Sequence, residues 1–263
     1  MADGGDVPAL DDEQEPRISL VRTALFFLGL GVLWEIAVPL TRVPSYLLPV
    51  PSEILTAYQE KGLYILSNLV PTFYETVGGF LVGAAFGITA GIGIVYSRVL
   101  WETLYPALVL LTSVPRIAIA PLILIWFGLG PQSKIIIAFL VSFFPMVINS
   151  VVGLSTLAPE LLELTRTMGA SRWDEFRKIR FPNSLPFLFA GFKASIALAV
   201  VGAVVGEFIG GEAGLGYLII LGNNQLDTRL VFAALLVLTA MTLALFGIIV
   251  GLERIFVPWQ RKR

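Results

Sequence analysis

The sequence predicts an all-α membrane protein with six transmembrane helices, and three observations support this fold class. Of the 263 residues, 56% are hydrophobic and only 14% are charged, whereas about a quarter of a soluble domain is charged. Several apolar stretches reach the roughly 20 residues that a helix needs to cross a bilayer. Lys and Arg are concentrated in alternate connections between those stretches, as expected for a chain that crosses the membrane repeatedly.

The predicted spans cover about 19–40, 68–96, 101–128, 134–157, 186–210 and 229–257. The acidic residues 1–16 lack the basic start and apolar core of a secretory signal, so we expect a disordered tail before one membrane domain over 17–263. Pro44, Pro49 and Pro51 interrupt the chain between the first two spans, where Ser52 and Glu53 favour only a short interfacial helix.

The basic residues orient the chain, because cytoplasmic connections carry an excess of Lys and Arg. With the N-terminus inside, the inner side collects Arg17, Arg22, Arg98, Arg254, Arg261, Lys262, Arg263 and the bases of the loop 158–185. The outer side keeps Arg42, Lys61, Lys134 and Arg229. We therefore expect both termini in the cytoplasm.

Glycines at four-residue spacing form ridges on three spans. They are Gly79, Gly83, Gly87 and Gly91 in the second span, Gly202, Gly206 and Gly210 in the fifth, and Gly247 and Gly251 in the sixth. Such ridges let helix backbones approach closely in lipid. One interpretation is packing within one subunit, and the other is a face that slides during a gating motion.

The third span contains Pro106, Pro115 and Pro121, and each proline removes a helix hydrogen bond. Irregular backbone at membrane depth requires surrounding protein or a water-filled cavity, and it often marks a transport site. Arg116 lies beside this break, where its guanidinium either binds an anionic solute or pairs with a carboxylate or with carbonyls that the proline frees. With Pro115, Pro121, Ser195 and Glu207, it forms a candidate translocation pathway.

The other acidic residues near the spans have simpler interpretations. Glu207 either pairs with a cation or braces the glycine-rich segment after it, which we interpret as a bent outer gate. Glu75 and Glu102 are expected near helix starts, where the helix dipole favours an acid. The sequence suggests no paired acids at membrane depth.

The loop "ELLELTRTMGASRWDEFRKIRFPNSLP" is basic and amphipathic in an otherwise apolar chain. A helix beginning near Pro159 is expected to end at Gly169 in the left-handed conformation. Ser171 and Asp174 form a capping-box-like start for a second helix over 173–179, which Pro182 and Pro186 are expected to close before the next span. The knob carries the apolar side chains of Leu161, Leu164, Trp173 and Phe176 inside a basic rim, so a partner surface is expected to receive it.

This loop resembles the cytoplasmic motif of ABC importer permeases: Glu-Ala-Ala, three residues, Gly, nine residues, Ile, any residue and Leu-Pro. Glu163, Gly169, Ile179 and Pro182 have the required spacing, whereas Leu164, Thr165 and Phe181 depart from the motif. The segments "PRIAIAPLILIWFGLG", "FFPMVINSVVGL", "GAVVGEFIGGEAGLGYLI" and "LERIFVPW" resemble one branch in particular. That branch includes permeases for nitrate, bicarbonate, taurine, alkanesulfonates and some aromatic or vitamin-precursor solutes.

The resemblance implies a type I importer permease of a bacterial inner membrane, with a coupling helix that docks in a cytoplasmic ATPase. The implied coupling residues are Glu163, Gly169, Ala170, Trp173, Phe176, Ile179 and Pro182. The implied partners are two ATPase subunits that hold ATP and Mg, a second permease copy or a paralogue, an extracytoplasmic binding protein and the lipid bilayer. The implied solute is a small anion, with riboflavin or a pyrimidine precursor as the alternative.

Several function classes are disfavoured. The chain has no Cys and no His, which excludes thiolate and Ser-His-Asp chemistry and metal sites built on those residues. No phosphate-binding loop of the P-loop type occurs, so ATP hydrolysis is assigned to a partner and the chain itself is not expected to be an enzyme. No basic stripe with interleaved aromatics lies outside the loop, and no nucleic-acid partner is expected. A stand-alone secondary carrier would normally need an internal repeat and coupling carboxylates, which the sequence does not suggest.

Overall fold

The computed structural model describes residues 20–157 and 159–259, so the predicted tail over 1–16 and the bases at 261–263 lie outside the described residues. The described part is helical with short turns and has no strand. Five of the described helices are long and apolar enough to cross a membrane, and a bent pair makes the sixth when its two halves are counted as one span. The predicted fold class, an all-α membrane protein with six spans, is confirmed. The long helices are α1 (Leu20–Thr41), α2 (Pro51–Tyr96), α5 (Pro131–Ser155), α8 (Phe181–Gly210) and α10 (Thr228–Phe256).

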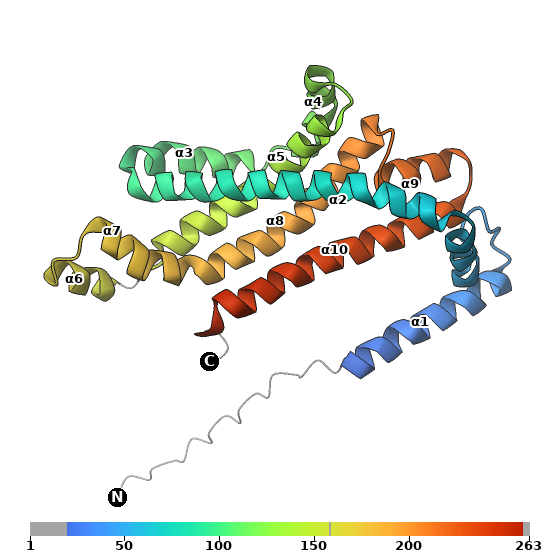
Figure 1. Ribbon diagram of the computed structural model, residues 1–263, viewed down its shortest axis with the longest axis horizontal. Helices are drawn as coiled ribbons and strands as arrows, with labels where there is room; N and C mark the ends of the chain where they lie inside the picture. Colours follow the sequence, from blue (N-terminus) through green and yellow to red (C-terminus); the bar gives the residue numbers. More distant parts are fainter. Residues whose placement is uncertain (1–19, 158, 260–263) are drawn as a thin grey trace, which may run out of the picture.

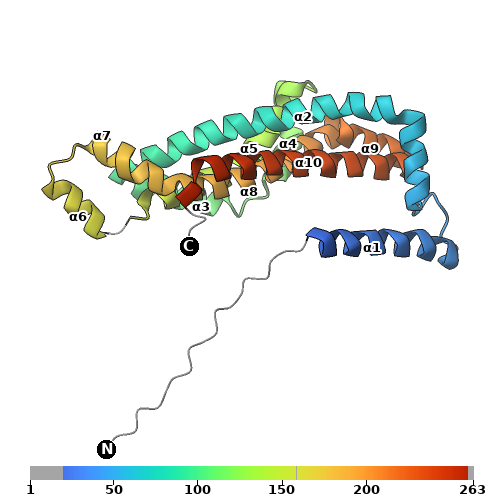
Figure 2. The ribbon, with the colours of Figure 1, turned by 60° about the horizontal axis from the view of Figure 1, so that its bottom comes forward.

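The long helices lie roughly side by side in an elongated bundle (Figure 1). Two short helices of the basic loop, α6 (Pro159–Thr167) and α7 (Arg172–Glu175), form one end. The helix α9 (Leu215–Asn224) and the start of α2 form the opposite end. We call residues 159–182 the elbow. Helix α1 stands beside the bundle (Figure 2), and it is tied to α2 where the Glu35 carboxylate accepts hydrogen bonds from the Ser52 amide (3.0 Å) and hydroxyl (2.7 Å).

Helix α2 consists of two helices joined at a kink, and the first of them is the short helix predicted between the first two spans. The helix begins at Pro51 and runs for 46 residues, with non-helical backbone angles at Lys61. Gly62 follows this kink, and the Lys61 ammonium forms an ion pair with Asp227 at 2.7 Å. The short helix predicted before the second span is therefore present, and a kink joins it to that span.

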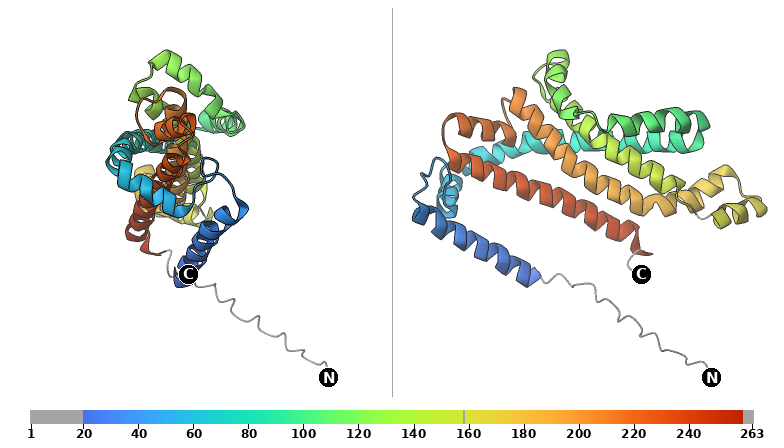
Figure 3. Two further views of the ribbon diagram at one scale, coloured as in Figure 1. Left: turned by 90° about the vertical axis from the view of Figure 1, so that its right-hand side faces the viewer. Right: turned by 180° about the vertical axis from the view of Figure 1, so that it is seen from behind.

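The third span is broken at the proline-rich segment, as its sequence indicated. Helix α3 (Arg98–Leu111) is followed by the 3-10 turn η1 (Arg116–Ile119) and by α4 (Ala120–Phe127), and the two halves meet at 84°. Pro106 remains inside α3 and Pro121 lies in the first turn of α4, so the chain changes direction just before Arg116. Helix α4 projects away from the bundle (Figure 3).

The glycine ridge of α2 packs against α5 inside the same subunit. A methyl group at Gly87 would lie 2.7 Å from the Met146 Cβ, and one at Gly91 would lie 2.5 Å from the Ser150 Cβ. Gly202 of α8 meets α5 from the other side, where a methyl group would lie 2.6 Å from the Ala138 Cα. This supports the packing interpretation for these ridges, because close backbone contact leaves no room for a side chain.

Helix α10 differs, since a methyl group added at Gly247 or Gly251 would have no other described heavy atom within 4 Å. Their face is therefore not used for packing inside the described chain.

The prediction that Pro182 and Pro186 end the second loop helix is wrong. Helix α7 continues through a π-helical turn, η2 (Phe176–Arg180), into α8, and the combined helix extends from Arg172 to Gly210. Pro182 falls in the first turn of α8, and the wide turn before it removes the need for the hydrogen bond that proline cannot donate.

Candidate functional site

The elbow turns at Gly169, which has a φ of +69°. A methyl group there would meet no other heavy atom of the described residues within 4 Å, so the backbone angle requires glycine. The Ala170 amide donates to the Thr165 carbonyl at 3.1 Å and closes the end of α6. The predicted left-handed turn is confirmed.

A side-chain cap starts the second helix of the elbow. The Asp174 amide donates to the Ser171 hydroxyl oxygen at 3.1 Å, and the same hydroxyl donates to the Asp174 carboxylate at 2.6 Å. This is the predicted start, although the helix begins one residue earlier than expected, at Arg172.

The elbow presents an aromatic face. The Trp173 side chain is 66% exposed, and its ring stacks on Phe176 with centroids 5.7 Å apart. Phe176 in turn contacts the Tyr96 ring at the end of α2. A shallow apolar hollow of about 450 Å³ is lined by these three rings, Ile92 and Arg172. An exposed tryptophan beside an apolar hollow is typical of a protein-docking surface.

The remaining predicted coupling residues surround this face. Glu163 and Ala170 are exposed, while Ile179 and Pro182 are half-buried. Ile179 and Ala170 line a second hollow between α6 and the start of the long helix. Leu164, which departs from the motif, has a side chain outside the described positions.

Arg180 connects the elbow to the bundle, a role that sequence reasoning missed. Its Nε donates to the Glu175 carboxylate at 2.6 Å, and its Nη1 donates to the Leu154 carbonyl at 3.0 Å near the end of α5. Its guanidinium also lies 5.9 Å from the centroid of the Tyr96 ring. In the sequence, Arg180 is one of several loop bases with no sign of a special role. The five-residue spacing from Glu175 brings the two side chains together when the turn between them is π-helical, and the sequence did not predict that turn.

The Arg116 guanidinium contacts two other groups of this chain. Its Nη2 donates to the Thr112 carbonyl at 3.0 Å, and its guanidinium lies 4.4 Å from the centroid of the Phe144 ring. The carbonyl belongs to the last turn before the break, so the contact matches the alternative in which arginine satisfies a freed backbone group. Pro115 and Pro121, on either side of it, are exposed.

Two other pathway candidates lie elsewhere and are buried. The Ser195 hydroxyl donates to the Ser142 carbonyl at 2.8 Å in the contact between α8 and α5. Glu207 is 1% exposed and accepts hydrogen bonds from the Thr72 hydroxyl and the Gly216 amide, each at 2.6 Å. Glu207 thus braces the segment after it, and the five candidates do not share one set of surroundings.

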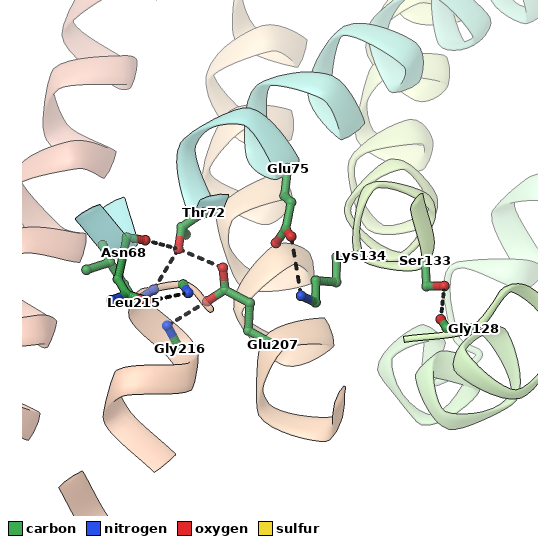
Figure 4. A network of polar contacts seen from close by, with 10 residues as sticks. Asn68, Thr72, Glu75, Gly128, Ser133, Lys134, Glu207, Leu215 and Gly216 are labelled. Atoms are coloured by element: carbon green, nitrogen blue, oxygen red, sulfur yellow. Dashed lines mark hydrogen bonds and ion pairs between the residues drawn. The ribbon is translucent and has the colours of Figure 1, made fainter. Parts of the chain in front are cut away.

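Glu207 belongs to a wider polar network that holds the start of α9 against α2 (Figure 4). The Gly214 amide donates to the Asn68 side-chain oxygen at 2.8 Å, and the Leu215 amide donates to the Thr72 hydroxyl oxygen at 2.8 Å. These bonds satisfy amides at the start of α9 that have no partner within that helix.

The expectation that Glu75 lies near a helix start, where the dipole explains it, is wrong. Glu75 lies in the middle of α2 and is fully buried. The Lys134 ammonium lies 3.5 Å from its carboxylate, and Lys134 is itself 5% exposed although it was expected in an outer connection. Glu207 is close enough to interact electrostatically with Glu75, so this part of the bundle contains the paired acids that the sequence did not suggest.

A more exposed charge pair lies where the α2 kink meets α10. Asp227 caps α10 by accepting from the Leu230 amide at 3.2 Å, and it pairs with Lys61. Burial alone raises the pKa of Asp227, but hydrogen bonds from Lys61 and the Leu230 amide outweigh it and leave the pKa below its ordinary value. The ionised carboxylate therefore stabilises both the kink and the helix start.

Comparisons with known proteins agree over most of the chain. Residues 83–262 match the family described as "Binding-protein-dependent transport system inner membrane component". The riboflavin transport system permease protein RibX of Chloroflexus aurantiacus is 35% identical, with coverage of 97% of this chain and 94% of that protein. The formylaminopyrimidine transport permease protein ThiX of Halalkalibacterium halodurans is 33% identical, with coverage of 91% and 96%.

Two further similarities concern another named solute and the fold. SsuC of Bacillus subtilis, named for aliphatic sulfonate transport, is 30% identical, with coverage of 87% of this chain and 83% of that protein. A chain of the MetNI methionine ABC transporter in an inward-facing conformation aligns with a TM-score of 0.58 and 19% identity, with coverage of 72% of this chain and 96% of that chain. At this identity the structural match supports the fold alone.

Proposed function

This chain belongs to the family of binding-protein-dependent transport system inner membrane components, and from that premise we propose that its elbow docks on a separate ATPase. It is a multi-pass ABC importer permease, and ATP hydrolysis belongs to another subunit. The observation that carries the docking proposal is the exposed Trp173 ring beside the apolar hollow at the end of the bundle. Such a face is costly to leave in water and has the size and chemistry of an interface anchor.

The geometry also supports a route by which docking acts on the spans. The helix that carries Trp173 continues without interruption into α8, and Arg180 attaches its base to the Leu154 carbonyl of α5. A displacement of the elbow therefore moves two spans together, because a helix and a bonded neighbour transmit displacement as a unit. Gly169 sets the angle at which α6 meets the continuous helix formed by α7 and α8.

The assembly that we propose contains two copies of this chain, or one copy and a paralogue, with two ATPases and an extracytoplasmic binding protein. The ATPases hold ATP and Mg, and this chain holds no cofactor. We place the elbow and both termini in the cytoplasm, because the excess of Lys and Arg lies on that side.

For the solute we propose a heteroaromatic, vitamin-type molecule. RibX and ThiX, named for riboflavin and formylaminopyrimidine, match nearly the whole chain at 35% and 33% identity. Arg116 supports this choice indirectly, because its guanidinium is already engaged by Thr112 and Phe144. A small anion such as a sulfonate is the second candidate, and the similarity to SsuC favours it.

Gly169→Val tests the docking proposal. A β-branched residue at a φ of +69° costs about 1–3 kcal/mol of backbone strain, so the variant is expected to lose ATPase binding or to hydrolyse ATP without transport. Copurification and ATP-driven uptake in vesicles measure the two effects. Gly247→Val in α10 is the control, since that position has open space and lies far from the elbow in sequence.

Normal ATPase binding and normal uptake by Gly169→Val would remove the elbow from the mechanism. Uptake by the purified chain alone, without ATP, would instead indicate a stand-alone carrier. Competition of uptake by riboflavin, pyrimidine precursors and alkanesulfonates identifies the solute class independently of the docking question.

A further inference from the structure

The buried charges of the bundle gather at one place, which we call the polar junction and define by Glu75, Lys134 and Glu207. They come from α2, α5 and α8, and they are 0%, 5% and 1% exposed (Figure 4). The junction adjoins the start of α9, where the Gly216 amide donates to Glu207. The proposed docking and transport roles use none of these charges.

Glu207 has the contacts of an ionised carboxylate. One oxygen accepts from the Thr72 hydroxyl and the other from the Gly216 amide, each at 2.6 Å. Short bonds from a hydroxyl and an amide are those that a charged acceptor receives. The negative charge of the junction is therefore assigned first to Glu207.

Glu75 has none of these supports. Both of its carboxylate oxygens are buried, and neither accepts a hydrogen bond from the described residues. Its nearest positive group is the Lys134 ammonium at 3.5 Å, which is longer than the roughly 2.7–2.9 Å of a charged hydrogen bond. A second ionised carboxylate would have to stand here without a single donor.

Charge balance then requires one more positive charge. Two carboxylates and one ammonium leave an excess negative charge in a region closed to water. Tyr74, next to Glu75 on α2, also interacts electrostatically with Glu75 and Glu207. A phenol supplies no positive charge, so Tyr74 does not restore the balance. The start of α9 contributes the backbone amides of Gly214, Leu215 and Gly216, which donate to Asn68, Thr72 and Glu207 respectively.

We propose that the polar junction binds one proton at neutral pH and that Glu75 holds it. An isolated charge buried in a low-dielectric interior neutralises by taking up a proton in preference to remaining ionised. Two neighbouring carboxyl groups commonly hold a single proton between them. The proton converts Glu75 from an unsupported acceptor into a donor beside the Glu207 carboxylate.

A metal cation fits this place poorly. Calcium-like ions take about six to eight oxygen ligands, whereas the carboxylate oxygens of the junction that have no hydrogen-bond partner among the described residues are only the two of Glu75. The described residues also contain no group of three or more acidic, His or Cys side chains arranged to hold a metal. A proton needs only one carboxyl group that lacks a hydrogen-bond donor, and Glu75 provides it.

The bound proton has a structural consequence for α9. While Glu75 is neutral, Glu207 can keep Thr72 and Gly216 together and hold the start of α9 against α2. Removal of the proton places two carboxylates side by side, and their repulsion opposes the same contacts. The docked position of α9 is thus linked to proton binding.

Infrared spectroscopy of the purified full-length chain in lipid nanodiscs tests the proposal, because protonated and ionised carboxyl groups absorb at different frequencies. We expect a carboxylic-acid carbonyl band at neutral pH that disappears in Glu75→Gln. Glu102→Gln is the matched control, because Glu102 is an exposed glutamate paired with Arg98, and it should retain the band. In addition, wild type should lose thermal stability by more than Glu75→Gln as the pH rises from mildly acidic values through neutrality, since the folded wild type there keeps a proton that the unfolded chain has already released.

Three results would overturn the proposal. Wild type without the band at neutral pH holds no such proton, and a band that persists in Glu75→Gln belongs to another residue. Failure of both Glu75→Gln and Glu75→Leu to fold, while Glu102→Gln folds normally, would mean that residue 75 must be charged. None of these results bears on elbow docking, which is measured separately by ATPase copurification.

Discussion

Replacement of Arg180 by Met tests the mechanical connection between the elbow and the bundle. The substitution keeps most of the apolar stem but removes two hydrogen bonds, one to Glu175 at 2.6 Å and one to the Leu154 carbonyl at 3.0 Å. The Arg180 and Glu175 side chains are only 16% and 17% exposed, so water replaces the lost partner poorly.

The expected cost follows from these contacts. A hydrogen bond to a charged group contributes about 1.5–3 kcal/mol, and a buried carbonyl left without a donor costs about 1–3 kcal/mol. We therefore expect Arg180→Met to weaken the attachment of the elbow to α5 by about 3 kcal/mol. This figure is lower than the sum of the two contributions, because both side chains retain some exposure. A loss of this size permits the elbow to move without α5.

The assay compares ATP hydrolysis with ATP-driven uptake in vesicles that contain the complete transporter. Arg180→Met should retain hydrolysis while uptake falls at least about tenfold, the factor that corresponds to 1.4 kcal/mol in an equilibrium. Arg177→Met is the control, because it removes an exposed base from the same helical turn. Glu175→Gln and the double variant complete a mutant cycle, and a nonadditive effect is expected for residues in direct contact.

Wild-type uptake by Arg180→Met would refute the transmission argument. A fully additive cycle would show that the contact between Arg180 and Glu175 carries no coupling, even if each residue matters separately.

Three further predictions concern packing, pH and the broken span. Gly87→Leu should lower the free energy of unfolding by about 1–3 kcal/mol through overpacking against α5, whereas Gly247→Leu should leave the melting temperature nearly unchanged. The pKa of Asp227 is depressed in the folded state, so its stabilising contribution is present at neutral pH and is lost as the pH falls through the folded pKa. Because Lys61 is 38% exposed, this loss of stability should stay below about 1 kcal/mol. Thermal melts across acidic pH should show that Asp227→Asn lacks this loss. Arg116→Lys should destabilise the broken third span, because an ammonium does not reproduce the contact of the planar guanidinium with the Phe144 ring. A lowered melting temperature with unchanged solute preference would confirm this, whereas a changed preference would place Arg116 on the solute path.

Local sequence signals predicted the elements that depend on local physics. The length of the apolar segments identified the spans, and the Ser171 cap and the left-handed Gly169 are set by residues close in sequence. The four-residue spacing of the α2 glycines identified a packing face, because a helix brings such positions into line. The proline-rich third span was expected to be irregular, although the 84° change of direction was not evident from the sequence.

Sequence reasoning fell short where a distant contact or an unusual turn decided the structure. The prolines at positions 44–51 correctly predicted a short separate helix, but the kink at Lys61 that joins it to the second span, and the pairing of Lys61 with Asp227, were not evident from the sequence. Pro182 suggested a helix end, but a π-helical turn accommodates it. The helix α9 was not predicted, because its glycine-rich start resembles a bend until Asn68 and Thr72 satisfy its amides.

The sequence alone determined that this chain is an apolar six-span protein with a capped, basic elbow, because hydropathy and helix capping act over a few consecutive residues. Only the tertiary structure placed Glu75 beside Lys134 and Glu207, and Arg180 against the end of α5. These residues come from different helices, and no local pattern specifies which faces of two helices meet. Packing of the glycine faces brings them together, and burial then makes their charges and hydrogen bonds matter.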